Sequence, residues 1–453
     1  MSAAPHNHPL AGALGQAVIL RLVGAALGFV TTVALARVLG ADGFGIYAYA
    51  LTLVTVLAVP AQFGVPALVV REATQARSGG QRSVYGAVIT LGLIAIFAYF
   101  AIILAPLLQG IVYALPAHLP ISSGGAWAAL GVALALALLA TLSAMFRAVG
   151  SPTTAQLGPE ALRPIALLAA LAGLTAAGCS LTGTGALLTH AVAAAAVCGV
   201  MGWVFYRHHP EAFRFKTPPP AALRHWHSTV WYLGLSAGIY GLVQSLDFLM
   251  LGWFEPMETV GAYRVAVQLV FFTALGLKAV EVVLAAPIAR LARDQHWQEL
   301  DQLAALSPII AAGLALPVVT ALVIAGDHFL LMAFGADYIS AWAPLAVLAT
   351  GKLVYLALAP AGLFLNMGGH AGWPLWTGGA ALFLNGLLNL LLIPPFGAIG
   401  AALATTTAFA AWGCLLWFGA RIRLNVTVNP FRLYGLRGAV NGLRMSGMGA
   451  SKP

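Results

Sequence analysis

The sequence predicts an all-α, polytopic membrane protein with about twelve transmembrane helices. Of its 453 residues, 61% are hydrophobic and only 8% are Asp, Glu, Lys or Arg. A soluble globular domain carries about 25% charged residues. The apolar residues also form long runs, and a helix needs about 20 such residues to cross a bilayer core. These observations exclude a soluble enzyme, a nucleic-acid-binding module and a disordered scaffold.

The apolar runs define the expected spans in order along the chain. The first half contains six of them, at residues 11–39, 43–70, 85–108, 126–149, 161–181 and 185–206. The second half contains six more, at residues 231–254, 261–286, 307–332, 342–365, 373–394 and 398–420. Within these runs apolar and polar residues do not alternate, which favours helices over strands.

The longest connection between expected spans separates the two halves of the chain. It is rich in Pro, His and basic residues, which is typical of a solvated linker. We therefore predict four segments: an N-terminal lobe (1–207), a cytosolic linker (208–230), a C-terminal lobe (231–420) and a basic cytosolic tail (421–453).

Lys and Arg residues gather in alternate connections. Arg147 and Arg163 flank one such connection, close to the ends of the adjoining spans, whereas the opposite connections 109–125 and 182–184 contain neither Lys nor Arg. Cytoplasmic connections of membrane proteins carry the excess of these residues. The pattern predicts that both termini are cytosolic.

A short motif recurs in the two halves. Residues 45–53 and 261–269 share the pattern G-x-Y-x-x-A-x-x-L. Both halves begin on the same side of the membrane, so this repeat is parallel, and many secondary transporters are built from such repeats. The first span also carries Gly24-x-x-x-Gly28, a spacing that permits close approach of helices.

Four segments of the chain resemble a known family. These are residues 36–47, 247–252 together with 260–266, 334–338, and 385–405. They are similar to segments of polysaccharide-biosynthesis flippases, the Wzx-like members of the multidrug/oligosaccharidyl-lipid/polysaccharide exporter superfamily. The resemblance implies a V-shaped bundle of two six-helix lobes around a central cavity. It also implies alternating access that moves undecaprenyl-pyrophosphate-linked oligosaccharide from the inner to the outer leaflet.

The resemblance further implies a setting and partners. The protein is expected in the bacterial inner membrane, in contact with membrane lipids and the lipid-linked oligosaccharide. A polysaccharide polymerase and glycosyltransferases are the expected protein partners, and nucleic acid is not expected. No cofactor is implied, and no spacing of His, Cys and carboxylates suggests a metal site.

Among the charged residues of the expected spans, six are candidates for a functional role, and their net charge is two positive. They are Arg21, Asp247, Arg264, Lys278, Glu281 and Lys352. A charge at the bilayer centre costs about 2.5–3.5 kcal/mol on insertion scales, so these residues are expected to face a cavity or a partner. Arg21 and Lys352 lie near midplane without a partner close in sequence. We predict that both contact substrate, because cations suit a pyrophosphate.

The other polar residues leave alternatives open. Lys278 either contacts substrate or forms an intrahelical pair with Glu281, three residues away. Asp247 and Arg264 form either a gate or a structural pair, and a coupling H⁺ or Na⁺ would bind at Asp247 or Glu281. Gln62 and Gln244 are candidates for binding sugar hydroxyls, although hydrogen bonds between helices are commoner.

Two other functions compete with the flippase. A cation-coupled multidrug exporter of the same superfamily is the first, but the expected spans 1–6 contain no acidic residue to bind a cation. A membrane-embedded ligase or polymerase acting on lipid-linked glycan is the second. No long outer loop is present to hold its catalytic groups, so we expect no enzymatic activity.

Overall fold

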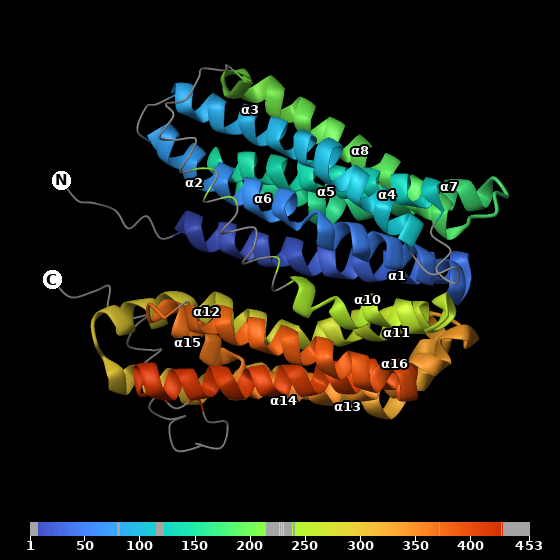
Figure 1. The fold of residues 1–453 in the computed structure, drawn as a ribbon. Coiled ribbons are helices and arrows are strands. Elements are labelled where there is room, and N and C mark those ends of the chain that lie inside the picture. Colours follow the sequence, from blue (N-terminus) through green and yellow to red (C-terminus); the bar gives the residue numbers. More distant parts are fainter. Residues whose placement is uncertain are drawn as a thin grey trace. The chain divides into compact units, whose positions relative to one another are not determined.

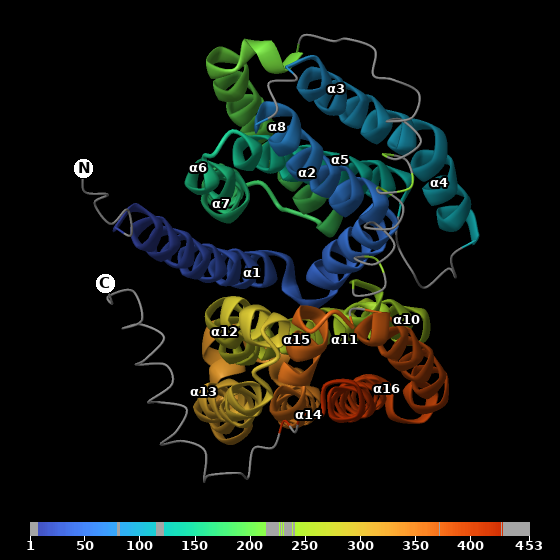
Figure 2. The ribbon, with the colours of Figure 1, turned by 90° about the vertical axis from the view of Figure 1, so that its left-hand side faces the viewer.

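The protein is all-helical throughout the part that the structure describes. The computed structural model describes residues 8–78, 82–114, 122–213, 226, 228, 230, 238, 241–370, 372–426 and 428. Eight helices in these residues are long and apolar enough to cross a membrane (Figures 1 and 2). Two of the eight combine two expected spans, in whole or in part, at a tight bend, as described below.

The chain divides into two compact units. The first consists of Met1–Ser245 and Pro256–Gly261, and the second of Leu246–Glu255 and Ala262–Pro453. The elements of the first unit, apart from the start of α11, are α1 (His8–Leu57), η1 (Pro60–Gly64), α2 (Val65–Ser78), α3 (Arg82–Ala98), η2 (Tyr99–Leu104), α4 (Ala105–Ala114), α5 (Ser123–Ala148), α6 (Pro152–Leu157), η3 (Gly158–Leu162), α7 (Arg163–Ala176), α8 (Gly183–His208) and η4 (Pro210–Phe213).

The first unit is built around α5, its most buried span. Small residues such as Ala133 and Ala137 are fully buried on this helix, which lets α8 and α2 pack closely against it. The helix α1 contains the first expected span and the start of the second, because Gly40 has φ 67° and turns the chain there. Glycine adopts this left-handed backbone region without steric cost.

The elements of the second unit include the long helix α16. They are α10 (Leu246–Phe254), α11 (Met257–Phe271), η5 (Phe272–Ala274), α12 (Leu275–Arg293), α13 (Trp297–Ala333), η6 (Ala336–Ala341), α14 (Trp342–Leu358), α15 (Pro360–Met367) and α16 (Gly372–Leu424). Gly397, with φ 53°, bends α16 into two arms that contain the last two expected spans. The two arms contact α10, α14 and α15.

The bend at Gly397 offers a test of the fold. Gly397→Ala is expected to destabilise the protein by about 1–2 kcal/mol, because the new side chain must adopt left-handed dihedral angles. Gly379→Ala is the matched control: it lies in a helical part of α16 with no atom within 4 Å of the added Cβ, and Ala favours helices. Thermal unfolding in detergent should show a lower midpoint for Gly397→Ala only, and equal midpoints would contradict this account of the bend.

One expected span begins in a different place. The fifth was predicted at residues 161–181, but the helical segment starts at Pro152 and ends at Ala176. Pro152 opens the helical segment, where its missing N–H costs nothing. The π-helix η3 accommodates Pro159 between α6 and α7, and Pro164 lies at the start of α7.

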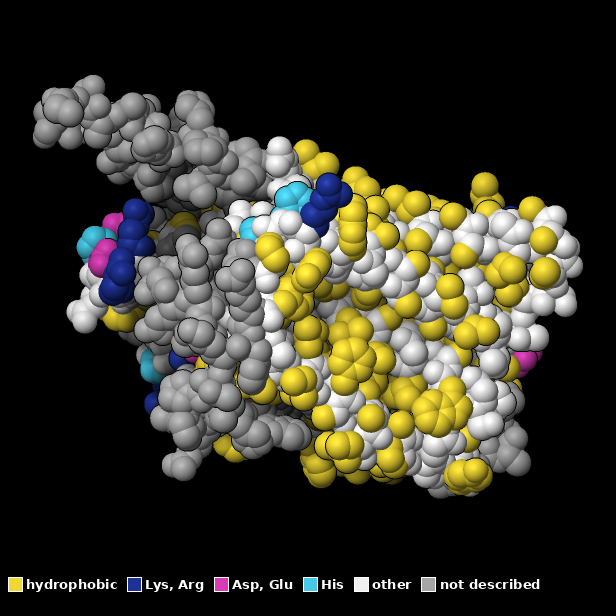
Figure 3. Space-filling model, turned by 90° about the horizontal axis from the view of Figure 1, so that it is seen from above, with side chains coloured by type: hydrophobic (Ala, Val, Ile, Leu, Met, Phe, Trp, Pro, Cys, Tyr) yellow, Lys and Arg dark blue, Asp and Glu magenta, His cyan; other side chains and the backbone are white. Residues whose placement is uncertain are grey.

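The surface agrees with a lipid environment. In Figure 3, hydrophobic side chains are scattered over the right-hand half of the view, whereas most of the visible Lys, Arg and His side chains lie at its left end and near its centre. Large apolar residues such as Leu188, Val192 and Ile102 are more than half exposed. The predicted linker (208–230) and tail (421–453) lie largely outside the described residues, so the four predicted segments stay a prediction.

Candidate functional site

The second unit contains a buried carboxylate, that of Asp247 on α10. Its side chain is 3% exposed. Its Oδ2 accepts hydrogen bonds from the Tyr263 hydroxyl (2.6 Å) and the Thr405 hydroxyl (2.9 Å), and its Oδ1 accepts one from the backbone N–H of Phe248 (2.8 Å). Buried charges persist in proteins only with such partners. Three donors therefore stabilise an anion inside this unit.

Two asparagines extend this network along α16. Asn385 donates to the Thr405 hydroxyl (3.2 Å), and Asn389 donates to the Asn385 Oδ1 (3.0 Å). The Asn389 Oδ1 is buried and accepts no hydrogen bond from the described residues. A buried acceptor of this kind needs a donor or a cation. Carboxylate, hydroxyl and amide oxygens are also the ligands that hard cations prefer.

Lys352 on α14 lies against aromatic rings. Its Nζ is 4.2 Å from the centroid of the Phe409 ring and 5.1 Å from that of Tyr355. Both rings also pack against Trp412. The charge of Lys352 interacts with those of Asp247 and Lys278. Aromatic faces stabilise a cation that has lost water.

The other charged candidates of the second unit differ in their environments. Lys278 and Glu281 form an ion pair of 2.7 Å across one turn of α12, and the Lys278 side chain is 54% exposed. The guanidinium of Arg264 lies 5.4 Å from the centroid of the Phe248 ring, and its charge acts on Asp247. Asp247 is thus partnered mainly by hydroxyl groups that the sequence prediction did not consider.

The first unit contains a charge cluster that the sequence analysis missed. Glu160 on η3 lies inside the candidate span Pro152–Ala176, so the expectation of no acidic residue in spans 1–6 is wrong. The charges of Arg21 and Arg163 both act on the Glu160 carboxylate. Arg163, predicted beside a connection, begins α7 within the same span. Arg21 itself is exposed on α1.

A buried histidine lies beside this cluster. The Tyr47 hydroxyl and the Nδ1 of His190 are hydrogen-bonded at 2.8 Å, and His190 is 4% exposed. Tyr47 and Tyr263 are equivalent in the sequence repeat, and in each unit this tyrosine hydrogen-bonds to a buried titratable group. The shared tyrosine was the signal in the sequence that pointed to both polar interiors.

The remaining predicted candidates are Gln62 and Gln244. Gln62 lies in the π-helix η1, and its Nε2 is buried without a hydrogen-bond partner among the described residues. Gln244 lies in the turn before α10 and is half-buried. No group of three or more His, Cys, Asp or Glu side chains suited to a metal occurs in the part of the chain that the structure describes.

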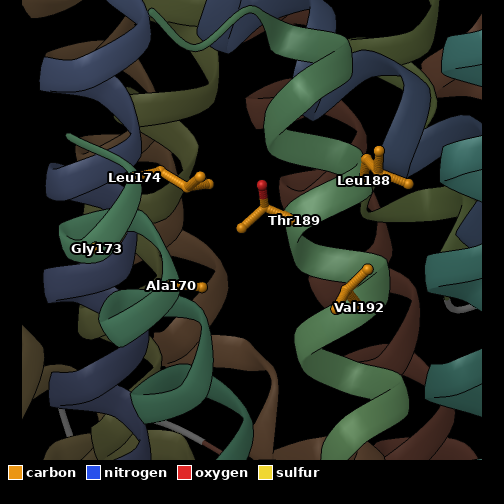
Figure 4. Close-up of a pocket in the computed structure, with 6 residues that line it drawn as sticks. All are labelled: Ala170, Gly173, Leu174, Leu188, Thr189 and Val192. Carbon is orange, nitrogen blue, oxygen red and sulfur yellow. The ribbon is translucent and has the colours of Figure 1, made fainter. Parts of the chain in front are cut away.

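A groove between α7 and α8 is lined almost entirely by apolar residues (Figure 4). Its volume is about 480 Å³, and its lining is Ala170, Gly173, Leu174, Leu188, Thr189 and Val192. The one hydroxyl, of Thr189, donates to the backbone carbonyl of Gly185 (2.9 Å). The lining offers no group for binding a phosphate or a sugar.

Comparison with known proteins identifies the family. A family model described as polysaccharide biosynthesis protein matches residues 16–282, more than half of the chain. The chain belongs to this family. Over 165 residues it is 26% identical to a Haloferax volcanii protein described as a probable low-salt glycan biosynthesis flippase, Agl15. That match spans 36% of this chain and 35% of the length of Agl15.

Solved structures share the fold of this polysaccharide biosynthesis protein. An inward-facing multidrug resistance MATE family transporter of the MOP superfamily superposes with a TM-score of 0.74 at 11% identity, over 90% of this chain and 98% of the transporter. An inward closed conformation of the lipid II flippase MurJ superposes with a TM-score of 0.73 at 13% identity, over 96% of this chain and 93% of MurJ. The predicted all-α, multi-pass membrane fold and the family resemblance are confirmed.

Proposed function

We propose that the protein is a flippase that moves undecaprenyl-pyrophosphate-linked oligosaccharide from the inner to the outer leaflet by alternating access. The observation that carries the proposal is the presence of cations in the membrane segments of both units, with Arg163 desolvated in the first unit and Lys352 desolvated in the second. Arginine and lysine at such depth are costly unless they act on an anion. A pyrophosphate carries the charge that they would bind.

The setting follows from the same proposal. We infer that the protein lies in the bacterial inner membrane with both termini in the cytosol, and that it acts without enzymatic turnover of its substrate. A polysaccharide polymerase and glycosyltransferases are its proposed partners, since one consumes and the others assemble the lipid-linked glycan. Family membership supports this assignment.

A coupling cation is proposed at Asp247. The buried Asp247 carboxylate and the unpartnered Asn389 Oδ1 belong to one hydrogen-bonded chain of four side chains. An H⁺ on the carboxylate or a Na⁺ among these oxygens would neutralise the buried charge. Glu281, already paired with Lys278 and more exposed, is the weaker candidate for this role.

A multidrug exporter is the second candidate function. Glu160 provides the acidic residue in the first unit that the sequence prediction lacked, and an anion there could bind an organic cation. Two arginines act on this carboxylate, which leaves the local charge positive and disfavours cationic drugs. Efflux of a cationic dye without a polysaccharide defect on gene deletion would favour the exporter.

Arg21→Ala tests the proposed function. Translocation of lipid-linked oligosaccharide, measured in proteoliposomes, is expected to fall at least about tenfold, because a charge-assisted hydrogen bond to phosphate contributes about 1.5–3 kcal/mol. Arg37→Ala, at the end of the same span, is the control and should translocate normally. Unchanged translocation by both variants would show that Arg21 does not bind the substrate.

A further inference from the structure

Arg21, a proposed substrate contact, already has an anionic neighbour within its own unit. The Glu160 side chain packs on Gly24, where an added Cβ would lie 2.8 Å from the Glu160 Cβ. Arg21 precedes Gly24 by three residues and so lies on the same face of α1. Gly24 therefore lets η3 approach α1 closely, which places Glu160 where the charge of Arg21 acts on it. Gly28, the second glycine of the predicted spacing motif, has no atom within 4 Å of an added Cβ.

Arg163 brings a second guanidinium to the same carboxylate. It follows Glu160 by three residues, and the charge of Glu160 acts on it. The side chain reaches the interior, since its Nε is buried and has no hydrogen-bond partner among the described residues. One anion, Glu160, thus interacts with two cations, and the cluster of Arg21, Glu160 and Arg163 has a net charge of one positive.

Two buried nitrogen atoms at this cluster, of Arg163 and His190, have no hydrogen-bond partner among the described residues. The Nε2 of His190 is buried without a partner in the described part of the chain, although its Nδ1 is hydrogen-bonded to Tyr47. The charge of Arg163 acts on His190, so the two side chains are neighbours. Buried nitrogen atoms are rarely left without partners in folded proteins. Two such nitrogens beside a cationic cluster point to an anionic ligand.

We propose that Glu160 is a resident anion that competes with the diphosphate group of the substrate for the guanidinium groups of Arg21 and Arg163. The inference rests on the proposed function and deepens it. Without substrate, Glu160 neutralises cations that would otherwise be unpaired in the membrane. When a diphosphate enters, the guanidinium groups bind its oxygens, for which their planar donor geometry is suited, and release the carboxylate.

This competition gives a reason for the presence of the Glu160 carboxylate in a site that binds an anionic diphosphate. A site made only of cations would hold a diphosphate tightly and release it slowly. Glu160 offers the two arginines an alternative partner at a fixed position, so departure of the substrate leaves no unpaired charge behind. Removing the Glu160 charge should therefore strengthen diphosphate binding and slow release, whereas a purely structural carboxylate would show neither effect.

The test measures binding of inorganic pyrophosphate to the full-length protein in nanodiscs. Glu160→Gln is expected to bind pyrophosphate about tenfold more tightly than the wild type, and to translocate lipid-linked oligosaccharide more slowly. Arg163→Gln is expected to bind it about tenfold more weakly, which shows that the probe occupies this site. Glu258→Gln, an exposed carboxylate at the start of α11, is the matched control and should bind like the wild type.

Two outcomes would overturn the inference. Equal or weaker pyrophosphate binding by a folded Glu160→Gln protein would make Glu160 a structural residue, and so would unchanged binding by Arg163→Gln. If Glu160→Gln does not fold, Glu160→Asp withdraws the carboxylate by one methylene group and should still bind more tightly than the wild type. Absence of glycan translocation in the wild type would defeat the proposed function alone, because pyrophosphate affinity is measured independently.

Discussion

Asp247→Asn is expected to abolish ion-driven transport while leaving the second unit folded. The amide has the shape of the carboxylate, and its oxygen can still accept hydrogen bonds from Tyr263 and Thr405. It has no negative charge, so it neither takes up a proton in the transport cycle nor attracts Na⁺. Translocation in proteoliposomes should no longer respond to an imposed proton or sodium gradient, whereas the wild type should respond to one of them.

The control variant distinguishes loss of the buried Asp247 charge from loss of any carboxylate in the same unit. Asp327→Asn removes an exposed carboxylate near the end of α13 in the same unit and should keep the gradient response. Thermal unfolding of both variants checks that they fold. A folded Asp247→Asn protein that still responds fully to the gradient would place the coupling site elsewhere, with Glu281 as the remaining candidate.

Thr405→Val tests whether the hydrogen bonds around Asp247 contribute to the response to the ion gradient. Valine retains the volume of threonine but removes the hydroxyl that links Asp247 to Asn385. Val and Thr differ in polarity rather than size, so the change tests the hydrogen bonds.

The sequence predicted those features that depend on local pattern. Long apolar runs predicted the spans, and the turns at Gly40 and Gly397 were expected between neighbouring runs because both occur at short glycine-rich breaks. Asp247 stood out as a carboxylate in an apolar run, where an unpaired charge is costly. Each of these inferences needs only residues within one or two helices.

The sequence did not predict which distant residues meet. Thr405 lies 158 residues from Asp247, and His190 lies 143 residues from Tyr47, so only the fold shows that they are bonded. Glu160 was missed for a local reason. The fifth span was predicted to begin at residue 161, directly after Glu160, whereas the π-helix η3 extends the span to include it and places the carboxylate in the membrane segment.

Lys352→Met is expected to lower translocation of the lipid-linked oligosaccharide at least about tenfold. Methionine has a similar length and can still pack against Phe409 and Tyr355, but it lacks the ammonium group. A hydrogen bond between a charged donor and a phosphate contributes about 1.5–3 kcal/mol, and each 1.4 kcal/mol corresponds to a factor of ten. Arg290→Met, an exposed cation at the end of α12, should translocate like the wild type.

Lys352 also has an alternative role, neutralisation of Asp247, and the same variant distinguishes it from substrate binding. Its charge acts on Asp247, so it could serve only to neutralise that carboxylate within the unit. In that case Lys352→Met would alter the response to the ion gradient and leave pyrophosphate affinity unchanged. If Lys352 contacts the substrate, pyrophosphate affinity falls together with translocation, and Lys352→Arg, which keeps the charge beside the aromatic rings, restores part of both.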